Sequence, residues 1–210
     1  MTKSGVNNIT VGFTGHRPNR LHTGEARVAV RLREVLTALR DGARATGATS
    51  RLIAVSPLAE GSDRLFAQAA LDLGYELQAM LPFKSADYET TFGDATTTSI
   101  YRTLLAQAAR VQELPGSLND TTAAYEAMGR AMVDEGDILV AVWDGKPAAG
   151  RGGTPEIIEY AIAGGRPVIW IDAAQDRASM RLKTVVPAIQ AEPLTSDAIA
   201  ELGAAKRSGS

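Results

Sequence analysis

The chain has 210 residues, 45% hydrophobic and 22% charged, which is ordinary for a globular protein and is most simply one domain with an ample core. Its 22 basic and 24 acidic residues give a net charge of −2, which excludes a global positive field for nucleic acid or an anionic membrane. Cysteine is absent and only two histidines occur, which excludes disulfides and thiolate metal sites, and we expect no metal site of histidines.

Targeting signals are not evident. The first eight residues lack the apolar stretch of a signal peptide, and no apolar run reaches the roughly 18 residues that span a membrane. We therefore expect a cytoplasmic protein with no membrane partner. Residues 1–8 are expected to be an N-terminal tail, residues 9–203 one domain, and residues 204–210 a disordered tail.

Short apolar runs alternate with segments of helical periodicity. The runs predict strands at residues 9–14, 52–56, 76–81, 110–114, 138–143 and 168–171. The periodic segments predict helices at residues 24–46, 62–73, 97–109, 121–135 and 155–163. Most runs are apolar throughout, as in strands covered on both faces. The alternation predicts an α/β fold with a doubly wound, mostly parallel, Rossmann-like sheet. The longer connection at residues 84–98 is expected to be a mobile flap.

Three glycine-containing loops follow predicted strands. In the first, Gly15 allows a tight turn, and the Arg17 guanidinium offers a forked donor to a phosphate or a carboxylate. His16 is a candidate to donate to a phosphate or to stack on a base, with a structural hydrogen bond as the alternative. The candidate ligand-binding residues of this loop are Gly12, Thr14, Gly15, His16 and Arg17.

The second loop opens the helix predicted at residues 62–73. We expect the amides of Gly61 and Ser62 to face a ligand, and Asp63 to accept from a ribose hydroxyl or an arginine. A plain helix cap at Ser62 or Asp63 is the alternative. Ser62 has no neighbouring histidine and no nucleophile-elbow pattern, so a serine hydrolase is rejected.

The third loop gives the strongest signal. Its glycines let a phosphate approach bare backbone N–H groups at the start of a helix, and the threonine hydroxyl adds a donor; an ordinary capped turn is the alternative. Arg151 is a candidate to clamp the same anion. Loops that leave parallel strands at one edge converge on one cleft, which indicates a phosphorylated ligand, above all a nucleotide. The candidates are Gly150, Arg151, Gly152, Gly153 and Thr154.

Four further residues lie near these loops. Phe83 is a candidate to stack on a base, although an aromatic residue at a strand end is more often core. Asp144 is a candidate to hold a ribose or a magnesium ion, or simply to turn the chain. Glu156 and Glu159 are the catalytic candidates, because they are the carboxylates nearest the third loop. Solvated acids favoured by the helix dipole are the alternative for both.

Five segments together resemble the SLOG superfamily, which groups Rossmann-like proteins related to the DNA-processing protein DprA, the Lonely-guy (LOG) phosphoribohydrolases and molybdenum-cofactor carriers. The resemblance covers residues 9–172. It implies a nucleotide or nucleotide-derived ligand, hydrolysed in some branches and sensed in others. The segments are Gly12-Phe-Thr-Gly-His-Arg17, Ala59-Glu-Gly-Ser-Asp-Arg64, Leu81-Pro-Phe83, Ala141-Val-Trp-Asp-Gly145 and Gly150-Arg-Gly-Gly-Thr154.

One departure from the LOG pattern bears on activity. LOG enzymes carry a proline-glycine-glycine-any-glycine-threonine motif, with the working glutamate three positions after the threonine. Counted from Thr154, that position is Ile157 here, and the leading proline is absent. The resemblance to LOG enzymes therefore supports a phosphate-binding loop in this chain better than it supports hydrolysis.

The leading expectation is a protein that binds or senses a nucleotide or a nucleotide derivative. The first alternative is a LOG-like nucleoside 5′-monophosphate phosphoribohydrolase, an N-glycosyl hydrolase in which Glu156 or Glu159 supplies the carboxylate. The second is DprA-like binding of single-stranded DNA, against which the acidic balance argues. No cofactor is expected beyond the nucleotide, with magnesium as an optional companion.

Two helices bear on self-association. The segments at residues 24–46 and 121–135 are long and alanine-rich enough to pack against a second copy, so we expect a homodimer. Tyr125 and Met128 lie in the second of these segments, and their expected role is core packing.

Overall fold

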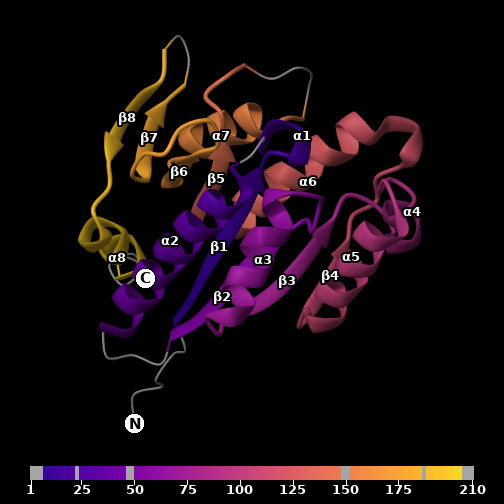
Figure 1. Cartoon of the computed structure of the whole chain (residues 1–210), viewed down its shortest axis with the longest axis horizontal. Helices are drawn as coiled ribbons and strands as arrows, with labels where there is room; N and C mark the ends of the chain where they lie inside the picture. The colour runs from indigo at the N-terminus through magenta and orange to yellow at the C-terminus, as the bar shows by residue number, and fades with distance from the viewer. Residues whose placement is uncertain (1–6, 22–23, 46–49, 148–151, 186–187, 205–210) are drawn as a thin grey trace.

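The computed structural model describes residues 7–21, 24–45, 50–147, 152–185 and 188–204. In this part of the chain, helices cover both faces of an eight-stranded sheet (Figure 1). The strands are β1 (Asn7–Gly15), β2 (Ser50–Ser56), β3 (Glu76–Leu81), β4 (Arg110–Glu113), β5 (Ile138–Trp143), β6 (Val168–Asp172), β7 (Met180–Thr184) and β8 (Gln190–Pro193). The helices are α1 (Pro18–Leu21), α2 (Glu25–Ala45), α3 (Ser62–Asp72), α4 (Ser85–Glu89), α5 (Ala95–Gln107), α6 (Thr121–Glu135), α7 (Thr154–Ala163) and α8 (Ser196–Ala204), with a 3₁₀ turn at Leu118–Asp120.

The strand order is β4-β3-β2-β1-β5-β6-β7-β8. The first six strands are parallel, and β7 and β8 continue the sheet as antiparallel strands. The chain runs outward from β1 to β4 and then returns to place β5 on the other side of β1. This is the doubly wound, mostly parallel, Rossmann-like sheet that the sequence predicts, and the fold-class prediction is confirmed. The reversal between β1 and β5 is where such sheets bind ligands.

The central strands are buried on both faces, which explains their unbroken apolar runs. In β5, Ile138, Val140 and Val142 join the core beneath α2, α3 and α8. Leu139, Ala141 and Trp143 alternate with them and join the core beneath α6 and α7. All six residues are buried. A parallel strand covered on both sides therefore reads as continuous rather than alternating hydrophobicity.

All predicted strands and helices are present, and β3, β5 and α6 have the predicted bounds. Five elements were not predicted: α1, α4, β7, β8 and α8. In β7 only Leu182 is fully buried, and β8 has no buried residue. Antiparallel strands at the end of a sheet expose alternate residues, so they lack the continuous apolar run that the prediction relied on.

The connection at residues 84–98 is a built structure rather than a plain loop. It contains α4 and the first turn of α5, whose N-terminus is closed by reciprocal hydrogen bonds between Asp94 and Thr97. The Arg64 guanidinium donates to the Thr97 carbonyl oxygen at 2.7 Å and lies over the Phe92 ring at 4.7 Å. These contacts tie the connection to α3. Its mobility stays a prediction.

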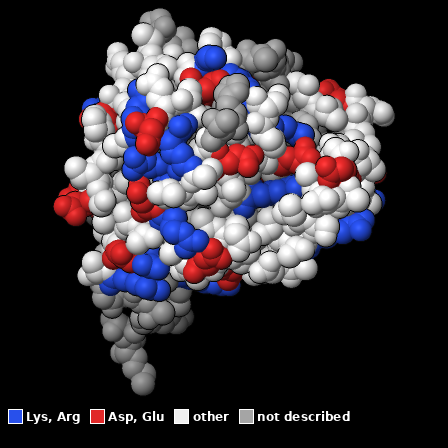
Figure 2. Space-filling view, viewed as in Figure 1, with Lys and Arg blue, Asp and Glu red and all other residues white. Residues whose placement is uncertain are grey.

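The predicted domain limits of residues 9 and 203 stay a prediction, and the described elements extend slightly beyond both. β1 begins at Asn7, inside the segment assigned to the first tail, and α8 continues to Ala204. The rest of both tails lies outside the described residues. No helix within the described ranges has the length and apolarity to cross a bilayer. Lys and Arg side chains alternate with Asp and Glu over the face that carries α2 and α3 (Figure 2).

Candidate functional site

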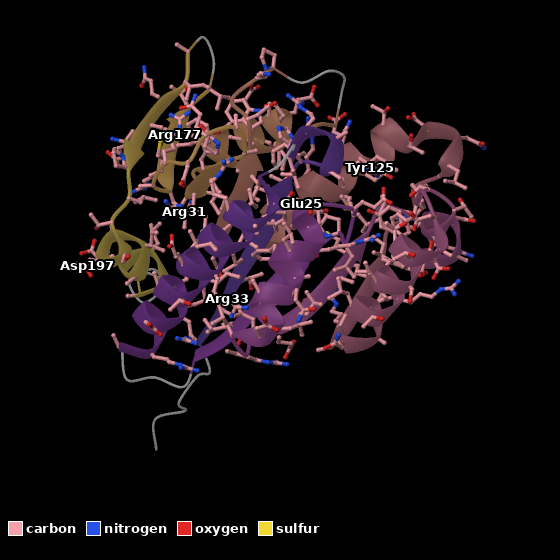
Figure 3. The ribbon with its side chains drawn as sticks, in the orientation of Figure 1. Glu25, Arg31, Arg33, Tyr125, Arg177 and Asp197 are labelled. Atoms are coloured by element: carbon pink, nitrogen blue, oxygen red, sulfur yellow. The ribbon has the colours of Figure 1, made fainter. Side chains whose placement is uncertain are left out.

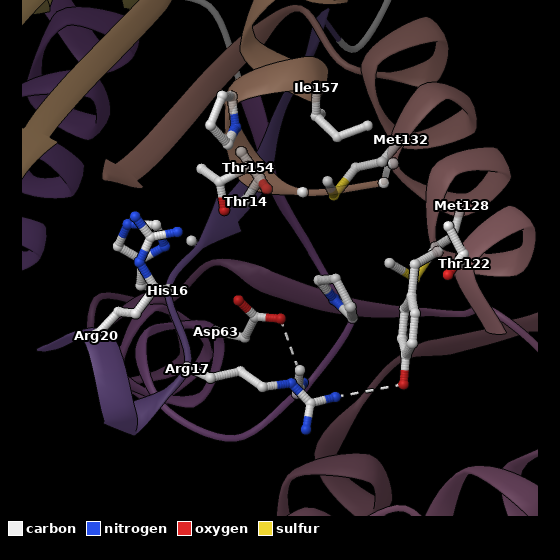
Figure 4. Close-up of a pocket in the computed structure, with 18 of the residues that line it drawn as sticks. Thr14, His16, Arg17, Arg20, Asp63, Thr122, Met128, Met132, Thr154 and Ile157 are labelled. Carbon is white, nitrogen blue, oxygen red and sulfur yellow. Dashed lines mark hydrogen bonds between the residues drawn. The ribbon is translucent and has the colours of Figure 1, made fainter. Parts of the chain in front are cut away.

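A cavity of about 340 Å³ opens at the carboxyl ends of β1 and β5, where the strand order reverses. Its walls come from the loop after β1, the loop before α3, and helices α4, α6 and α7 (Figure 4). Each of the three predicted glycine loops contributes some of its described residues to this lining, among them Gly15, Asp63 and Gly153. Volume and position are typical of a small-molecule site.

The first loop lines the cavity with Thr14, Gly15, His16 and Arg17. A Cβ on Gly15 would stand 2.3 Å from the Ser62 hydroxyl oxygen, so the loop can pass this close to α3 only as glycine. Gly12 does not line the cavity, because it lies in β1 beneath Met132 of α6. Glycine at that position brings the helix close to the sheet.

Arg17 presents a partly free cation to the cavity. Its Nη2 donates to the Tyr125 hydroxyl at 3.3 Å, and Nη1 lies 3.5 Å from Glu60 Oε2. The side chain is 41% exposed, and neither contact is a tight ion pair. Donors therefore remain available for an incoming anion, in the forked geometry that suits phosphate.

Arg20 and His16 share a buried acid behind this loop. Arg20 binds the Asp144 carboxylate with Nε and Nη2, at distances from 2.8 to 3.2 Å. His16 Nε2 lies 2.9 Å from Asp144 Oδ1 and 3.1 Å from the Asp144 amide nitrogen. Burial lowers the pKa of His16 despite the raising effect of the Asp144 hydrogen bond, so the imidazole is neutral at pH 7.

Asp144 anchors the first loop and does not line the cavity. Burial acts to raise its pKa, but hydrogen bonds from His16, the Lys146 amide and Arg20 together hold that pKa below its ordinary value. Its Oδ1 accepts from the Lys146 amide at 3.1 Å, two residues further along the chain, which is the pattern of an aspartate that turns the chain. A role with ribose or magnesium stays a prediction. Among the described residues, no three His, Cys, Asp or Glu side chains cluster as a metal site.

The second loop holds the first in place. Gly61 has φ +92°, which favours glycine, and a Cβ there would also meet the His16 carbonyl oxygen at 2.8 Å. Both the amide and the hydroxyl of Ser62 donate to that same oxygen, at 3.1 and 2.8 Å. Neither Gly61 nor Ser62 lines the cavity. The Ser62 amide therefore faces the first loop, and ligand contact by Gly61 or Ser62 stays a prediction.

Asp63 is the carboxylate that the second loop turns into the cavity (Figure 4). It is 5% exposed, and its Oδ2 accepts from the Ala59 amide at 3.3 Å. Burial raises the pKa of Asp63 to about 7, against the lowering effects of that hydrogen bond and of Arg17 and Arg64. A buried acid with a pKa near neutrality in a cleft is a candidate functional group.

A cluster of aromatic residues borders the cavity through Tyr88. Tyr88 of α4 lines the cavity, while Phe83 is buried below it in the core and does not reach the lining. Their ring centroids lie 5.6 Å apart, edge to face. Phe83 thus packs under the site, and its stacking on a base stays a prediction.

The third loop brings Gly152, Gly153 and Thr154 to the cavity at the N-terminus of α7. Gly150 and Arg151 lie outside the described residues. The Gly152 amide donates to Glu156 Oε2 at 2.5 Å, so this glutamate closes its own helix terminus. Glu156 does not line the cavity, and Glu159 is exposed. Neither catalytic candidate reaches the cavity in this conformation, and their catalytic role stays a prediction.

Ile157, rather than either glutamate, forms part of the cavity wall. It lines the cavity, and a Cβ on Gly129 of α6 would stand 2.4 Å from its Cδ1, so the side chain packs closely against that helix. Met128 and Met132 of α6 extend the same apolar surface. Counting three positions from Thr154 therefore gives the residue that faces the site, and the residue is apolar.

Several residues that line the cavity were not among the predicted site residues. Arg20 lies on the unpredicted helix α1, Tyr88 on the unpredicted helix α4, and Tyr125 and Met128 were assigned to the core. Tyr125 projects from α6 (Figure 3) and meets Arg17, which is distant in sequence. One feature of the sequence could have indicated these two α6 residues as site candidates. The helix predicted at residues 121–135 comes directly before the strand whose carboxyl end borders the cavity.

The sequence matches no protein-family model and no curated protein. Among solved structures, DNA processing protein A (DprA) from Streptococcus pneumoniae is similar, with a TM-score of 0.50 and 18% identity over 80% of this chain and 53% of DprA. This chain thus spans about half the length of DprA. The structural-genomics target TM1055 aligns with a TM-score of 0.48 and 14% identity, over 76% of this chain and 72% of that one.

The similarity to DprA is one of fold, given the low sequence identity. DprA is among the proteins to which the SLOG resemblance relates this chain, so the Rossmann-like fold expected from that resemblance is confirmed.

Proposed function

We propose that this protein binds or senses a nucleotide or a nucleotide derivative in the cavity between β1 and β5. One observation carries the proposal. The N-terminus of α7, with Gly153 and Thr154, opens into the same cavity as Arg17, whereas Arg20, which also lines it, is paired with Asp144. A helix N-terminus and arginine side chains both favour phosphate, and they meet at the reversal of strand order.

The remaining walls suit the uncharged parts of such a ligand. Met128, Met132 and Ile157 offer an apolar surface for a base, and Asp63 and Tyr125 offer hydrogen bonds. A thermal-shift panel of nucleoside mono-, di- and triphosphates tests the proposal. Stabilisation by at least one of them supports it, and the absence of any shift contradicts it.

We expect phosphate recognition to depend on Arg17. A hydrogen bond to a charged group contributes about 1.5–3 kcal/mol, or about tenfold to over a hundredfold in affinity. Arg17→Ala should therefore weaken a nucleotide strongly and its dephosphorylated nucleoside hardly at all. The matched control is Arg33→Ala, because Arg33 lies on the outer face of α2, away from Tyr125 (Figure 3). Calorimetric titration measures both affinities, and equal losses for nucleotide and nucleoside would instead indicate collapse of the loop.

Binding is better supported than fast hydrolysis. Departure of a base from ribose generates positive charge that a carboxylate stabilises, and Ile157 stands where the LOG pattern has one. Of the described residues that line the cavity, Asp63 alone carries a carboxylate.

We expect no base release from nucleoside 5′-monophosphates, followed by chromatography of the free bases. The variants Glu156→Gln and Glu159→Gln test the hydrolase alternative, because each removes one of the two candidate catalytic carboxylates. Turnover at ordinary enzyme rates that falls by about a hundredfold or more in either variant would overturn the binding proposal.

Binding of single-stranded DNA remains the second alternative, suggested by the name of the structural neighbour. The net charge of −2 and the mixed charges on the face that carries α2 and α3 (Figure 2) favour a small ligand over a polyanion. Salt-dependent retention of the protein on single-stranded DNA would favour this alternative.

A cytoplasmic location, a magnesium companion and a homodimer stay proposals. α2 already packs against α3 and α8, and α6 against α7.

A further inference from the structure

Glu60 joins the phosphate-binding end of the cavity to the connection at residues 84–98. Its Oε2 lies 3.5 Å from Arg17 Nη1, and its Oε1 accepts a hydrogen bond from the Gly93 amide at 3.2 Å. The Glu60 side chain is 16% exposed, whereas that of Arg17 is 41% exposed. One half-buried carboxylate therefore contacts both a cation that lines the cavity and a backbone amide of the connection.

Arg64 holds the loop that carries Glu60 against the same connection. Its guanidinium donates through Nε to the Leu58 carbonyl oxygen at 3.2 Å and through Nη1 to the Thr97 carbonyl oxygen at 2.7 Å. Leu58 has φ +58°, which is uncommon for a residue other than glycine. Backbone strain of this kind persists only where the surrounding contacts impose it. The position of Glu60 is thus set by the contact between its loop and residues 84–98.

This position places an internal anion at the cation that we expect to bind phosphate. Arg17 Nη2 donates to the Tyr125 hydroxyl at 3.3 Å (Figure 4), which leaves Nη1 beside Glu60. A carboxylate and a phosphate both seek the forked donors of a guanidinium, and two anions at one guanidinium repel each other. The ligand's phosphate therefore competes with Glu60 for Arg17.

The same competition reaches the Gly93 amide. Two contacts orient the Glu60 carboxylate, one to Arg17 and one to Gly93. Groups that share a partner in this way are coupled, so the loss of one contact leaves the carboxylate freer to rotate and weakens the other.

We propose that Glu60 is a self-inhibitory contact that competes with the ligand's phosphate for Arg17 and couples phosphate binding to release of the Gly93 amide. The inference rests on the proposed function and adds regulation to that same site. Because coupling between two sites is reciprocal, whatever draws residues 84–98 away from Glu60 strengthens phosphate binding by the same factor.

The first test is Glu60→Gln. Glutamine keeps the shape of the side chain and an oxygen that accepts from Gly93, but it lacks the negative charge. A partly exposed ion pair contributes little, so we expect the variant to bind the nucleotide found in the panel about twofold to fivefold more tightly. Its affinity for the dephosphorylated nucleoside should not change. Calorimetric titration measures both.

The matched control is Glu89→Gln. Glu89 belongs to α4 of the same connection, where its carboxylate accepts from Arg102 at 2.6 to 3.1 Å, and it does not line the cavity. This variant removes the same charge and should keep the wild-type affinity. An unchanged affinity in Glu60→Gln would overturn the competition. A weaker affinity would also overturn it, because it would show that Glu60 positions Arg17 for the ligand.

The second test needs no ligand. Arg17→Ala removes one of the two contacts of Glu60, so the Gly93 amide should exchange its hydrogen with solvent about twofold to fivefold faster, as followed by NMR. The Thr97 amide, which Asp94 holds at 2.7 Å within the same connection, should keep its rate. In the wild type, bound nucleotide should accelerate the Gly93 amide in the same way.

The two tests separate the coupling from the proposed function. An unchanged Gly93 rate in Arg17→Ala would overturn the coupling, whether or not a nucleotide binds. Faster exchange in that variant, together with failure of every nucleotide in the panel to bind, would overturn the proposed function while the link between Arg17 and Gly93 stands.

Discussion

Gly153→Asp should abolish nucleotide binding and leave the fold intact. Gly153 lines the cavity and is the N-cap of α7, with φ −84° and ψ 166°, a conformation that any residue adopts. Aspartate is among the most favourable N-cap residues, so the variant should retain or gain stability. Its carboxylate would stand where the phosphate belongs. Like charges placed together cost several kcal/mol, which corresponds to a loss of at least about a hundredfold.

The control for this variant is Gly153→Ser. Serine caps a helix as well as aspartate does but adds no charge, so it should retain most of the affinity. Circular dichroism and thermal unfolding check the fold of both variants, and calorimetric titration with the nucleotide found in the panel measures binding. If Gly153→Asp binds that nucleotide as tightly as the wild type, its phosphate lies elsewhere.

The parallel core of this fold was readable from the sequence because burial on both faces leaves an unmistakable pattern. β5 shows it most clearly, with six consecutive buried residues between Gly136 and Asp144. The glycines after the strands marked their carboxyl ends, and parallel topology then placed the loops at one edge. The antiparallel strands β7 and β8 leave no such pattern, because most of their residues are exposed or only partly buried.

The site was only partly readable, for a different reason. Asp63 and Arg17 line the cavity because each lies in a loop that follows the carboxyl end of a parallel strand. The sequence analysis predicted both as ligand-binding residues. The role of a side chain on a helix face depends on which neighbour covers it. Tyr125 and Tyr88 are aromatic residues that pack like core residues and still border the cavity, and no local pattern distinguishes the two situations.

Glu156 illustrates the same limit. Its place in the first turn of α7 suggested chemistry, but a carboxylate there also bonds the unsatisfied amides of the helix terminus. The short contact with the Gly152 amide shows that it does so in this conformation. Its neighbour Ile157 faces the cavity, as the rotation of about 100° per residue along a helix requires.

Asp63→Asn should make the protein progressively more stable than the wild type as the pH rises from about 4 to 8. In the wild type, burial raises the pKa of Asp63 from 3.8 to about 7. Below pH 3.8 the residue is protonated in both the folded and the unfolded chain, so it costs nothing. Between pH 3.8 and 7 the unfolded chain loses this proton first, and the free energy of unfolding falls. Above pH 7 the loss is complete.

The expected change is large because the group is buried. A difference of about three pKa units, at about 1.4 kcal/mol per unit, amounts to about 4 kcal/mol between the two ends of the pH range. Asparagine does not titrate, so the variant lacks the pH-dependent contribution of Asp63 to the free energy of unfolding. The contributions of the other titrating groups are shared by both proteins and cancel in the comparison. Urea unfolding at several pH values measures it.

The control is Asp72→Asn on the exposed end of α3. Hydrogen bonds from Gln68 and Arg33 lower the pKa of Asp72, so its contribution to stability is lost only as the pH falls below about 4. The difference between Asp72→Asn and the wild type should therefore be flat from pH 4 to 8. A flat difference for Asp63→Asn as well would show that the carboxyl is solvated and ionised at neutral pH.

A nucleotide hydroxyl that donates to Asp63 stabilises its charged form, so bound ribonucleotide should reduce the pH-dependent penalty in the wild type and have no such effect in Asp63→Asn.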